Sequence, residues 1–197
     1  MKKKLAVWMG VSCLLLAIAA LVSGCPGADV VVIPDRGLEL AIRAELTQPF
    51  CFLTRADLAE VNQLDARSRS IRDLTGLEYC VNLTGLNLAS NDISDITPLT
   101  QLQGLTYLNL ENNAVNDLGP LSGLFYLDAI LLFNNDIRDL SPLVANAENG
   151  GIGEGTFIWL GEEVLSEENT AILDQIEQLR DNHITVIVAA TGSEGAA

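Results

Sequence analysis

The chain has 197 residues and an acidic composition, with 26 Asp and Glu against 11 Lys and Arg and a formal net charge of −15. Three lysines lie within the first 24 positions, which we expect to be cleaved, so the mature chain carries a net charge of 8 − 26 = −18. This charge argues against binding to nucleic acid and against docking on anionic lipid. The mature length, 197 − 24 = 173, fits one domain.

Residues 1–24 have the pattern of a secretory signal. A basic start at Lys2–Lys4 precedes an apolar stretch of about 17 residues, Leu5–Leu21. The segment ends in Val22-Ser23-Gly24-Cys25, which resembles a bacterial lipobox, in which the cysteine thiol is lipidated and cleavage leaves Cys25 as the mature N-terminus. The alternative is an uncleaved transmembrane anchor, although about 17 apolar residues are at the lower limit for a spanning helix. We expect an extracytoplasmic protein anchored to a bacterial membrane by lipidated Cys25, because several acyl chains anchor stably.

Residues 25–34 are expected to form a short tether, at most about 30 Å long. An alternative is that the apolar run Val30–Ile33 packs as a first edge strand. Pro26, rather than Asp, follows the lipidated cysteine; by resemblance to known sorting behaviour, this favours the outer membrane in a Gram-negative cell. At the other end, residues 191–197 are expected to be disordered.

A 22-residue repeat occupies the centre of the chain. Asn91, Asn113 and Asn135 recur at this spacing, and their surroundings repeat with them. The three copies read LTGLNLASNDISDITPL, LTYLNLENNAVNDLGPL and LDAILLFNNDIRDLSPL, and a degenerate fourth copy lies one period upstream. This is the L-x-x-L-x-L-x-x-N-x-L pattern of leucine-rich repeats, and we place the repeats over residues 61–165.

Each position of the repeat has a physical role. The L-x-L core is a short strand whose residues point alternately inward and outward. The Asn ends the strand, and its amide can bond to backbone groups that the turn leaves unpaired. One unit cannot bury its own apolar face, so units must stack and need caps at both ends. The predicted fold is α/β, a short curved leucine-rich-repeat solenoid with a parallel sheet of about five strands on its concave face.

The register of the repeat fails once. Leu132 should recur at position 154, but its equivalent is Leu160, an offset of 28 positions instead of 22. We place the added residues within Ala145–Gly155, as a Gly-rich loop. The place of the Asn in the pattern is then taken by Glu163.

These repeats and their flanks resemble the internalin-type 22-residue class of bacterial leucine-rich repeats, over roughly residues 33–188. The upstream flank looks like a helical N-cap and first half-repeat, with the sequences IPDRGLELAIRAEL and LTRADLAEVNQLDARSRSIRDLTGLEYCVNL. The downstream flank looks like a closing helix and strand, with the sequence VLSEENTAILDQIEQLRDNHITVIV. The resemblance implies a helical N-cap over residues 35–60, a helix–strand C-cap over residues 166–190 and short 3₁₀-like convex segments. It also implies a protein-binding solenoid, without naming a partner.

Two cysteines, Cys51 and Cys80, remain after Cys13 leaves with the signal and Cys25 is lipidated. An oxidising compartment permits a disulfide between them, and capping motifs of this class often carry a bridge at this junction. The alternative is two small buried thiols, because Cys80 aligns with core leucines of later repeats. Both interpretations stay open at this point.

The sequence offers little for catalysis. The one histidine, His183, precedes the last strand, where a lone His is usually a surface residue. The chain has no G-x-S-x-G, phosphate-loop or H-E-x-x-H motif, and we expect neither enzymatic activity nor a cofactor. Asp73, Asp95, Asp117 and Asp139 form a ladder that could suit Ca²⁺. We expect them instead to accept backbone hydrogen bonds in the turns, and we predict no metal site.

The register identifies the residues that flank the leucines and face the concave side. Of the ten aromatic residues, Trp8 lies in the signal, and four of the other nine fall on this face, towards its C-terminal end. Exposed aromatic clusters usually mark binding sites. The predicted binding residues are Tyr107, Asn109, Glu111, Leu131, Phe133, Phe157 and Trp159. The alternative for Phe157 and Trp159 is packing under the inserted loop or against the C-terminal cap.

We therefore predict a non-enzymatic protein- or peptide-binding module that uses its concave face. The alternative is a structural envelope lipoprotein that binds peptidoglycan or polysaccharide, for which aromatic platforms with neighbouring Asn and Asp would be suitable. The concave face projects only a few hundred Å², about half or less of the roughly 800 Å² per partner of a standard interface. A protein partner would also have to contact the Gly-rich loop or a flank, whereas a peptide or glycan could fit the face alone.

Overall fold

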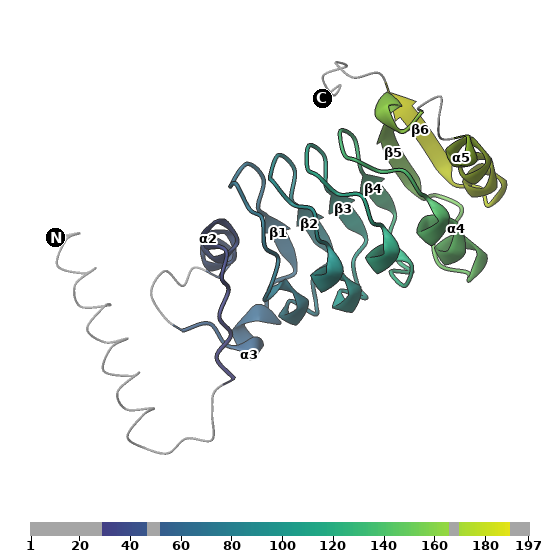
Figure 1. Cartoon of the computed structure of the whole chain (residues 1–197). Coiled ribbons are helices and arrows are strands. Elements are labelled where there is room, and N and C mark those ends of the chain that lie inside the picture. Colours follow the sequence, from purple (N-terminus) through teal and green to yellow (C-terminus); the bar gives the residue numbers. More distant parts are fainter. Residues whose placement is uncertain (1–28, 47–51, 166–169, 190–197) are drawn as a thin grey trace, which may run out of the picture.

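The computed structural model describes residues 29–46, 52–165 and 170–189, and within them six strands form one parallel sheet in sequence order (Figure 1). The strands are β1 (Gln63–Asp65), β2 (Gly85–Asn87), β3 (Tyr107–Asn109), β4 (Ala129–Leu131), β5 (Phe157–Gly161) and β6 (Thr185–Ala189). The predicted solenoid is confirmed. The described sheet has six strands and not about five, because the strand of the C-cap pairs in parallel with β5 and continues the sheet.

Strand pairing follows the sequence period. Tyr107 pairs with Gly85 on one side and with Ala129 on the other, at steps of 22 positions. Ala129 then pairs with Phe157 and Phe157 with Thr185, two consecutive steps of 28 positions. The predicted offset of 28 is thus confirmed, and the closing strand repeats it.

Short helices return the chain on the convex side. The first three returns are 3₁₀ turns, η1 (Leu77–Tyr79), η2 (Thr97–Gln101) and η3 (Gly119–Leu121), as expected. The fourth is an α-helix, α4 (Ser141–Glu148), so the prediction that residues 145–155 form a loop is wrong for their first part. The six added residues give this return enough length for a full helix, and only the residues that follow it form a loop.

Asn146 anchors this inserted segment and was not singled out by the sequence pattern. Its side chain is fully buried. Its Nδ2 donates to the carbonyls of Leu121 at 2.8 Å and Leu124 at 3.1 Å, and its Oδ1 accepts from the Ile152 N–H at 2.9 Å. One amide therefore ties α4 and the following loop to the preceding repeat.

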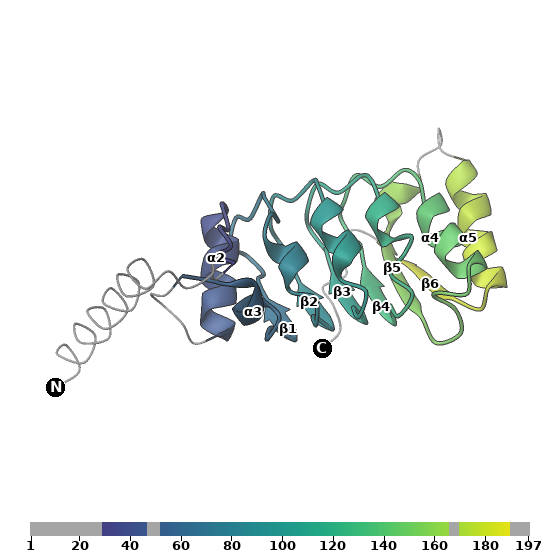
Figure 2. The ribbon, with the colours of Figure 1, turned by 90° about the horizontal axis from the view of Figure 1, so that it is seen from below.

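Caps close the solenoid at both ends, with α2 at one end and α5 at the other (Figure 2). The N-cap holds α2 (Arg36–Glu45) and the short α3 (Arg55–Leu58). A capping box between Thr54 and Asp57 starts α3. The C-cap consists of η4 (Glu162–Val164), α5 (Ala171–Asp181) and β6. The predicted helical N-cap and helix–strand C-cap are both present.

Residues 29–33 pack against the N-cap. Val30 forms an antiparallel bridge with Thr54, the Val31 N–H donates to the Leu53 carbonyl at 2.8 Å, and Ile33 is buried. The prediction of a tether over residues 25–34 is therefore wrong for these residues, because the bridge at Val30, the backbone bond of Val31 and the burial of Ile33 fix them on the N-cap. Cys25, the signal segment and the tail 191–197 lie outside the described residues. Within the described residues, no helix combines the length and the apolar character that crossing a membrane requires.

A ladder of amides runs beside the leucine core. The Asn91 Oδ1 accepts from the Ile71 N–H at 3.0 Å, and its Nδ2 donates to the Leu88 carbonyl at 2.8 Å. Asn113 and Asn135 make the equivalent bonds one and two periods later. The predicted role of the Asn is confirmed: it pairs buried backbone groups that would otherwise lack a partner.

Candidate binding surface on the concave face

The outward-facing side chains form three rows across the sheet. The first row consists of Gln63, Gly85, Tyr107, Ala129, Phe157 and Thr185. The second row consists of Asp65, Asn87, Asn109, Leu131, Trp159 and Ile187. The third row continues the ladder two residues further and consists of Arg67, Ala89, Glu111, Phe133, Gly161 and Ala189.

The C-terminal half of these rows is an exposed apolar surface. Tyr107 is 38% exposed, Phe157 53% and Ile187 40%. Leu131, Phe133 and Trp159 are half-buried beside them. We call these six residues the apolar patch. The alternative that Phe157 packs under the inserted segment is wrong, because more than half of the residue is exposed.

Ile187 belongs to the apolar patch but was missed from the sequence. Its strand was expected only to close the solenoid, yet it pairs with β5 in register, with Ile187 opposite Trp159. The alternation Thr185-Val186-Ile187-Val188 could have identified it, since Val186 is buried and Ile187 is exposed. Trp159 therefore has Leu131 on one side and Ile187 on the other.

A slot interrupts the first row. Ala129 lies between Tyr107 and Phe157 and contributes only a methyl group. Because neighbouring strands are about 4.8 Å apart, the two aromatic residues stand on backbones about 10 Å apart. Van der Waals contact on both faces of a flat group takes about 7 to 8 Å. The backbone spacing at this slot, Tyr107–Ala129–Phe157, is therefore compatible with a planar group between the two aromatic side chains.

Asn109 faces the concave side but offers little surface. It is 6% exposed, its Oδ1 accepts from the Glu111 N–H at 2.8 Å, and its Nδ2 donates to the Glu111 Oε2 at 3.2 Å. Asn87 and Asp65 likewise accept from the N–H two residues further on. Asp65, Asn87 and Asn109 of the second row thus satisfy the sheet's own backbone.

Glu163 takes an unusual position at the end of β5. Its Oε1 accepts from the Asn134 N–H at 2.6 Å, whereas its Oε2 is buried and has no hydrogen-bond partner among the described residues. The carboxylate lies over Gly161, where any side chain on that residue would collide with it. It therefore occupies the outward-facing place that Gly161 leaves empty in the third row, next to Phe133.

The apolar patch lies in an acidic part of the chain. Residues 101–165 contain one basic residue, Arg138, and nine acidic ones: Glu111, Asp117, Asp128, Asp136, Asp139, Glu148, Glu154, Glu162 and Glu163. The basic residue of the third row, Arg67, lies at the other end of the sheet and binds Asp65 at 2.7 Å. Its hydrogen bonds hold the pKa of the Asp65 carboxyl below its usual value.

Comparisons with known proteins agree with this geometry. The family described as Leucine Rich repeats (2 copies) matches residues 81–123. A crystal structure of an internalin (InlF) from Listeria monocytogenes aligns with a TM-score of 0.65 and 24% identity, over 85% of this chain and 54% of that one. The fold is an internalin-like leucine-rich-repeat solenoid. This solenoid spans about half the length of that internalin structure.

Two further solved structures align less closely with the solenoid. Internalin C2 from Listeria monocytogenes is 21% identical over 81% of this chain and 95% of that one, with a TM-score of 0.37. The CBM51-2 and INT domains of ZmpB from Clostridium perfringens, in complex with GlcNAc, are 32% identical over 44% of this chain and 18% of that one, with a TM-score of 0.41. No curated protein matches the chain.

The aspartate ladder serves the turns of the internalin-like solenoid. Each Asp accepts from the N–H two residues further on: Asp73 from Thr75 at 2.8 Å, Asp95 from Thr97 at 2.8 Å, Asp117 from Gly119 at 2.7 Å and Asp139 from Ser141 at 2.9 Å. The predicted turn role is confirmed. Among the described residues, no group of three or more His, Cys, Asp or Glu is placed to hold a metal ion.

Cys80 is a free, fully buried thiol on the convex side of the solenoid. Burial raises its pKa to about 12. This agrees with the alternative in which Cys80 is a core residue. Cys51 lies outside the described residues, so the Cys51–Cys80 bridge stays a prediction without support from the structure.

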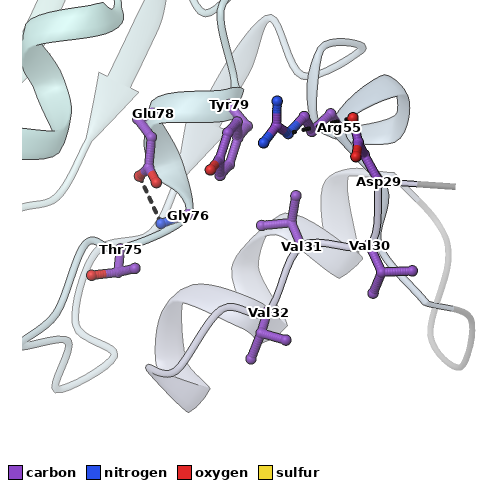
Figure 3. A pocket seen from close by; sticks show the side chains of 9 residues that line it. All are labelled: Asp29, Val30, Val31, Val32, Arg55, Thr75, Gly76, Glu78 and Tyr79. Carbon is purple, nitrogen blue, oxygen red and sulfur yellow. Dashed lines mark hydrogen bonds and ion pairs between the residues drawn. The ribbon is translucent and has the colours of Figure 1, made fainter. Parts of the chain in front are cut away.

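A small cavity of about 180 Å³ lies away from the concave face, between residues 29–32 and η1 (Figure 3). The Arg55 guanidinium stands 4.6 Å from the centre of the Tyr79 ring and 3.8 Å from the Asp29 carboxylate. The Glu78 carboxylate accepts from the Gly76 N–H at 2.7 Å. Arg55 and Asp29 of this cavity thus pair with each other and Glu78 binds a backbone N–H, and these contacts join the N-terminal segment to the first repeat.

Proposed function

We propose that the protein is a membrane-anchored, extracytoplasmic lipoprotein that binds a protein or peptide through the C-terminal half of its concave face, without catalysis. The observation that carries this proposal is the apolar patch: six neighbouring apolar side chains across β3–β6, three of them more than a third exposed. Large exposed apolar clusters on a folded domain are typically interaction sites. The lipid anchor rests on the lipobox-like sequence before Cys25.

The character of the patch favours a protein or peptide over a glycan. Saccharide binding needs several hydrogen-bonding side chains next to the aromatic platform. Asn109, the nearest amide in the second row, is buried and bonded to Glu111, so the Glu111 carboxylate is the polar group that this part of the patch exposes. Leu131 and Ile187 beside Trp159 extend an apolar surface instead. Such a surface suits the apolar side chains of a peptide.

Site-specific photocrosslinking in the native envelope tests the site. A photoreactive benzoylphenylalanine replaces Phe157 on the concave face or, as a control, Leu173 on α5, which is 52% exposed. We expect a discrete adduct from position 157 that position 173 does not give. If positions 157 and 173 yield the same products, or neither yields one, the concave face is not the binding surface.

The captured partner then allows affinities to be compared. Phe133→Ala and Trp159→Ala should each weaken binding by about 30-fold, because a buried aromatic anchor contributes about 2 kcal/mol. Tyr126→Ala removes an aromatic side chain that is 68% exposed but lies outside the three rows, and it should change affinity less than twofold. Unchanged affinity in both patch variants, with circular dichroism showing intact folding, contradicts the proposal.

The anchor is tested separately. Mass spectrometry of the N-terminal peptide should find a diacylglyceryl group on Cys25, and Cys25→Ala should release the protein from the membrane fraction. An unmodified Cys25 in membrane-bound protein would favour the uncleaved transmembrane anchor.

A further inference from the structure

We propose that the concave site takes a basic peptide segment, with the cationic head of a Lys or Arg seated on Phe133 between the carboxylates of Glu111 and Glu163. This inference rests on the proposed function and specifies the chemistry of its ligand. It follows from the third row, in which one aromatic ring stands between two acidic groups.

The order of the third row places the three groups side by side. Glu111 precedes Phe133 in the row, since the Asn112 N–H donates to the Phe133 carbonyl at 2.9 Å. Gly161 follows Phe133, and the Glu163 carboxylate covers Gly161. With neighbouring strands about 4.8 Å apart, the backbones of Glu111 and Gly161 lie about 5 Å to either side of Phe133, and the Glu163 carboxylate takes the side-chain place at Gly161.

Neither carboxylate is fully engaged within the protein. Glu111 is partly exposed, and its Oε2 accepts from the Asn109 amide at 3.2 Å. Glu163 accepts from the Asn134 N–H through one oxygen, and its other, buried oxygen has no partner in the part of the chain that the structure describes. The Glu163 charge therefore acts on a ligand from behind the surface, and the ring and Glu111 form the contact.

Desolvation decides which ligand fits. A partner that covers Phe133 must also remove water from Glu111 and from the edge of Glu163. An apolar or acidic group there would leave these charges uncompensated, which is unfavourable. A guanidinium or ammonium group offsets the desolvation, pairs with the Glu111 carboxylate, is attracted by the Glu163 charge behind the surface and stacks on the ring face.

The slot in the first row gives the peptide a second contact. Ala129 in the slot and Phe133 in the third row are four residues apart along the chain, a distance of about 13 Å in an extended strand. An extended peptide covers the same distance in four residues. A basic side chain on Phe133 therefore places the side chain four residues away between Tyr107 and Phe157, where a planar group fits.

The test uses the capped peptide Gly-Arg-Gly-Ser-Gly-Phe-Gly and two relatives in which citrulline or Glu replaces the Arg. Citrulline keeps the shape of the side chain and removes its charge. The protein is expressed from the full chain with Trp8→Phe and studied in detergent micelles, so that Trp159 is its one tryptophan whether or not the signal is cleaved. Trp159 lies in the second row beside Leu131, so its fluorescence reports binding at the patch.

At low ionic strength we expect the Arg peptide to bind at least tenfold more tightly than the citrulline peptide, and the Glu peptide to bind more weakly still. Glu111→Gln and Glu163→Gln should each reduce this preference at least threefold. Asp117→Asn makes the same charge change in a convex turn and should leave the preference unchanged. Because Glu163→Gln alters a buried group, Glu111→Gln at the surface provides the independent variant, and thermal melting checks both.

Equal affinity for the Arg and citrulline peptides overturns the inference, as does a preference that Glu111→Gln and Asp117→Asn reduce equally. Neither result bears on the crosslinking experiment. If the partner captured from position 157 binds without a basic segment, the proposed function is supported and this inference alone is contradicted.

Discussion

Replacing Asn146 by Ala tests how the inserted segment is held on the solenoid. The Asn146 amide is fully buried and serves the Ile152 N–H and the carbonyls of Leu121 and Leu124. Without it the Ile152 N–H loses its partner in a buried place, at about 1 to 3 kcal/mol. The carbonyls lose about 0.5 to 1 kcal/mol each, since the Leu121 oxygen still accepts from the Leu124 N–H at 3.1 Å. We expect a loss of about 3 kcal/mol in total.

The measurement is urea unfolding followed by far-ultraviolet circular dichroism, with amide hydrogen exchange at Ile152 as a local readout. A loss of about 3 kcal/mol corresponds to a melting temperature about 6 to 12 °C lower for a domain of this size. The Ile152 amide should exchange faster in the variant, because its acceptor is gone.

Asn149→Ala is the matched control. Asn149 is exposed at the end of the same helix, and its Nδ2 donates to the Ala145 carbonyl at 2.7 Å. The same substitution there should change stability by less than about 0.5 kcal/mol. A loss below about 1 kcal/mol for Asn146→Ala, or equal losses in both variants, would refute the reasoning that buried amide bonds fix the insertion.

Three further predictions follow from the caps and turns. Burial raises the pKa of the Cys80 thiol to about 12. Iodoacetamide at pH 8 should therefore leave Cys80 unmodified in the native protein and alkylate it in urea. Rapid labelling of the native protein would contradict the core position of Cys80. Hydrogen bonds from Thr97 lower the pKa of Asp95, and the Ser141 N–H and hydroxyl lower the pKa of Asp139. The two ionised carboxylates therefore stabilise the fold above pH about 4, and this stabilisation is lost as the pH falls through the lowered pKa values. Melting temperatures should therefore fall in acid, with a shallower fall in Asp139→Asn; a rise below pH 4 would show that these bonds do not matter. Finally, Gly37→Ala should destabilise the protein by about 1 to 3 kcal/mol, although Ala is the better helix former. The added Cβ would lie 2.5 Å from the Arg69 carbonyl oxygen. A variant that is more stable in urea unfolding would show that α2 can shift away from Arg69.

Much of the candidate site could be predicted because the 22-residue period repeats the same local geometry. Tyr107, Phe157 and Trp159 were placed on the concave face by counting from the leucines, and strand pairing puts them there. Counting could not show how much of each side chain is exposed. Asn109 occupies an outward-facing position, yet its short side chain folds back on the Glu111 N–H, which depends on the local turn and not on the period.

The sequence by itself determined the architecture, because regularly spaced leucines and asparagines can bury their apolar side and pair their turns only by stacking in parallel. It also determined which half of the concave face is aromatic. Only the tertiary structure decided that β6 adds Ile187 to this face, that Asn146 ties down the insertion and that the Glu163 carboxylate covers Gly161 beside Phe133. These features depend on contacts between residues of different repeats where the 22-residue period no longer holds, so packing, and not local pattern, selects them.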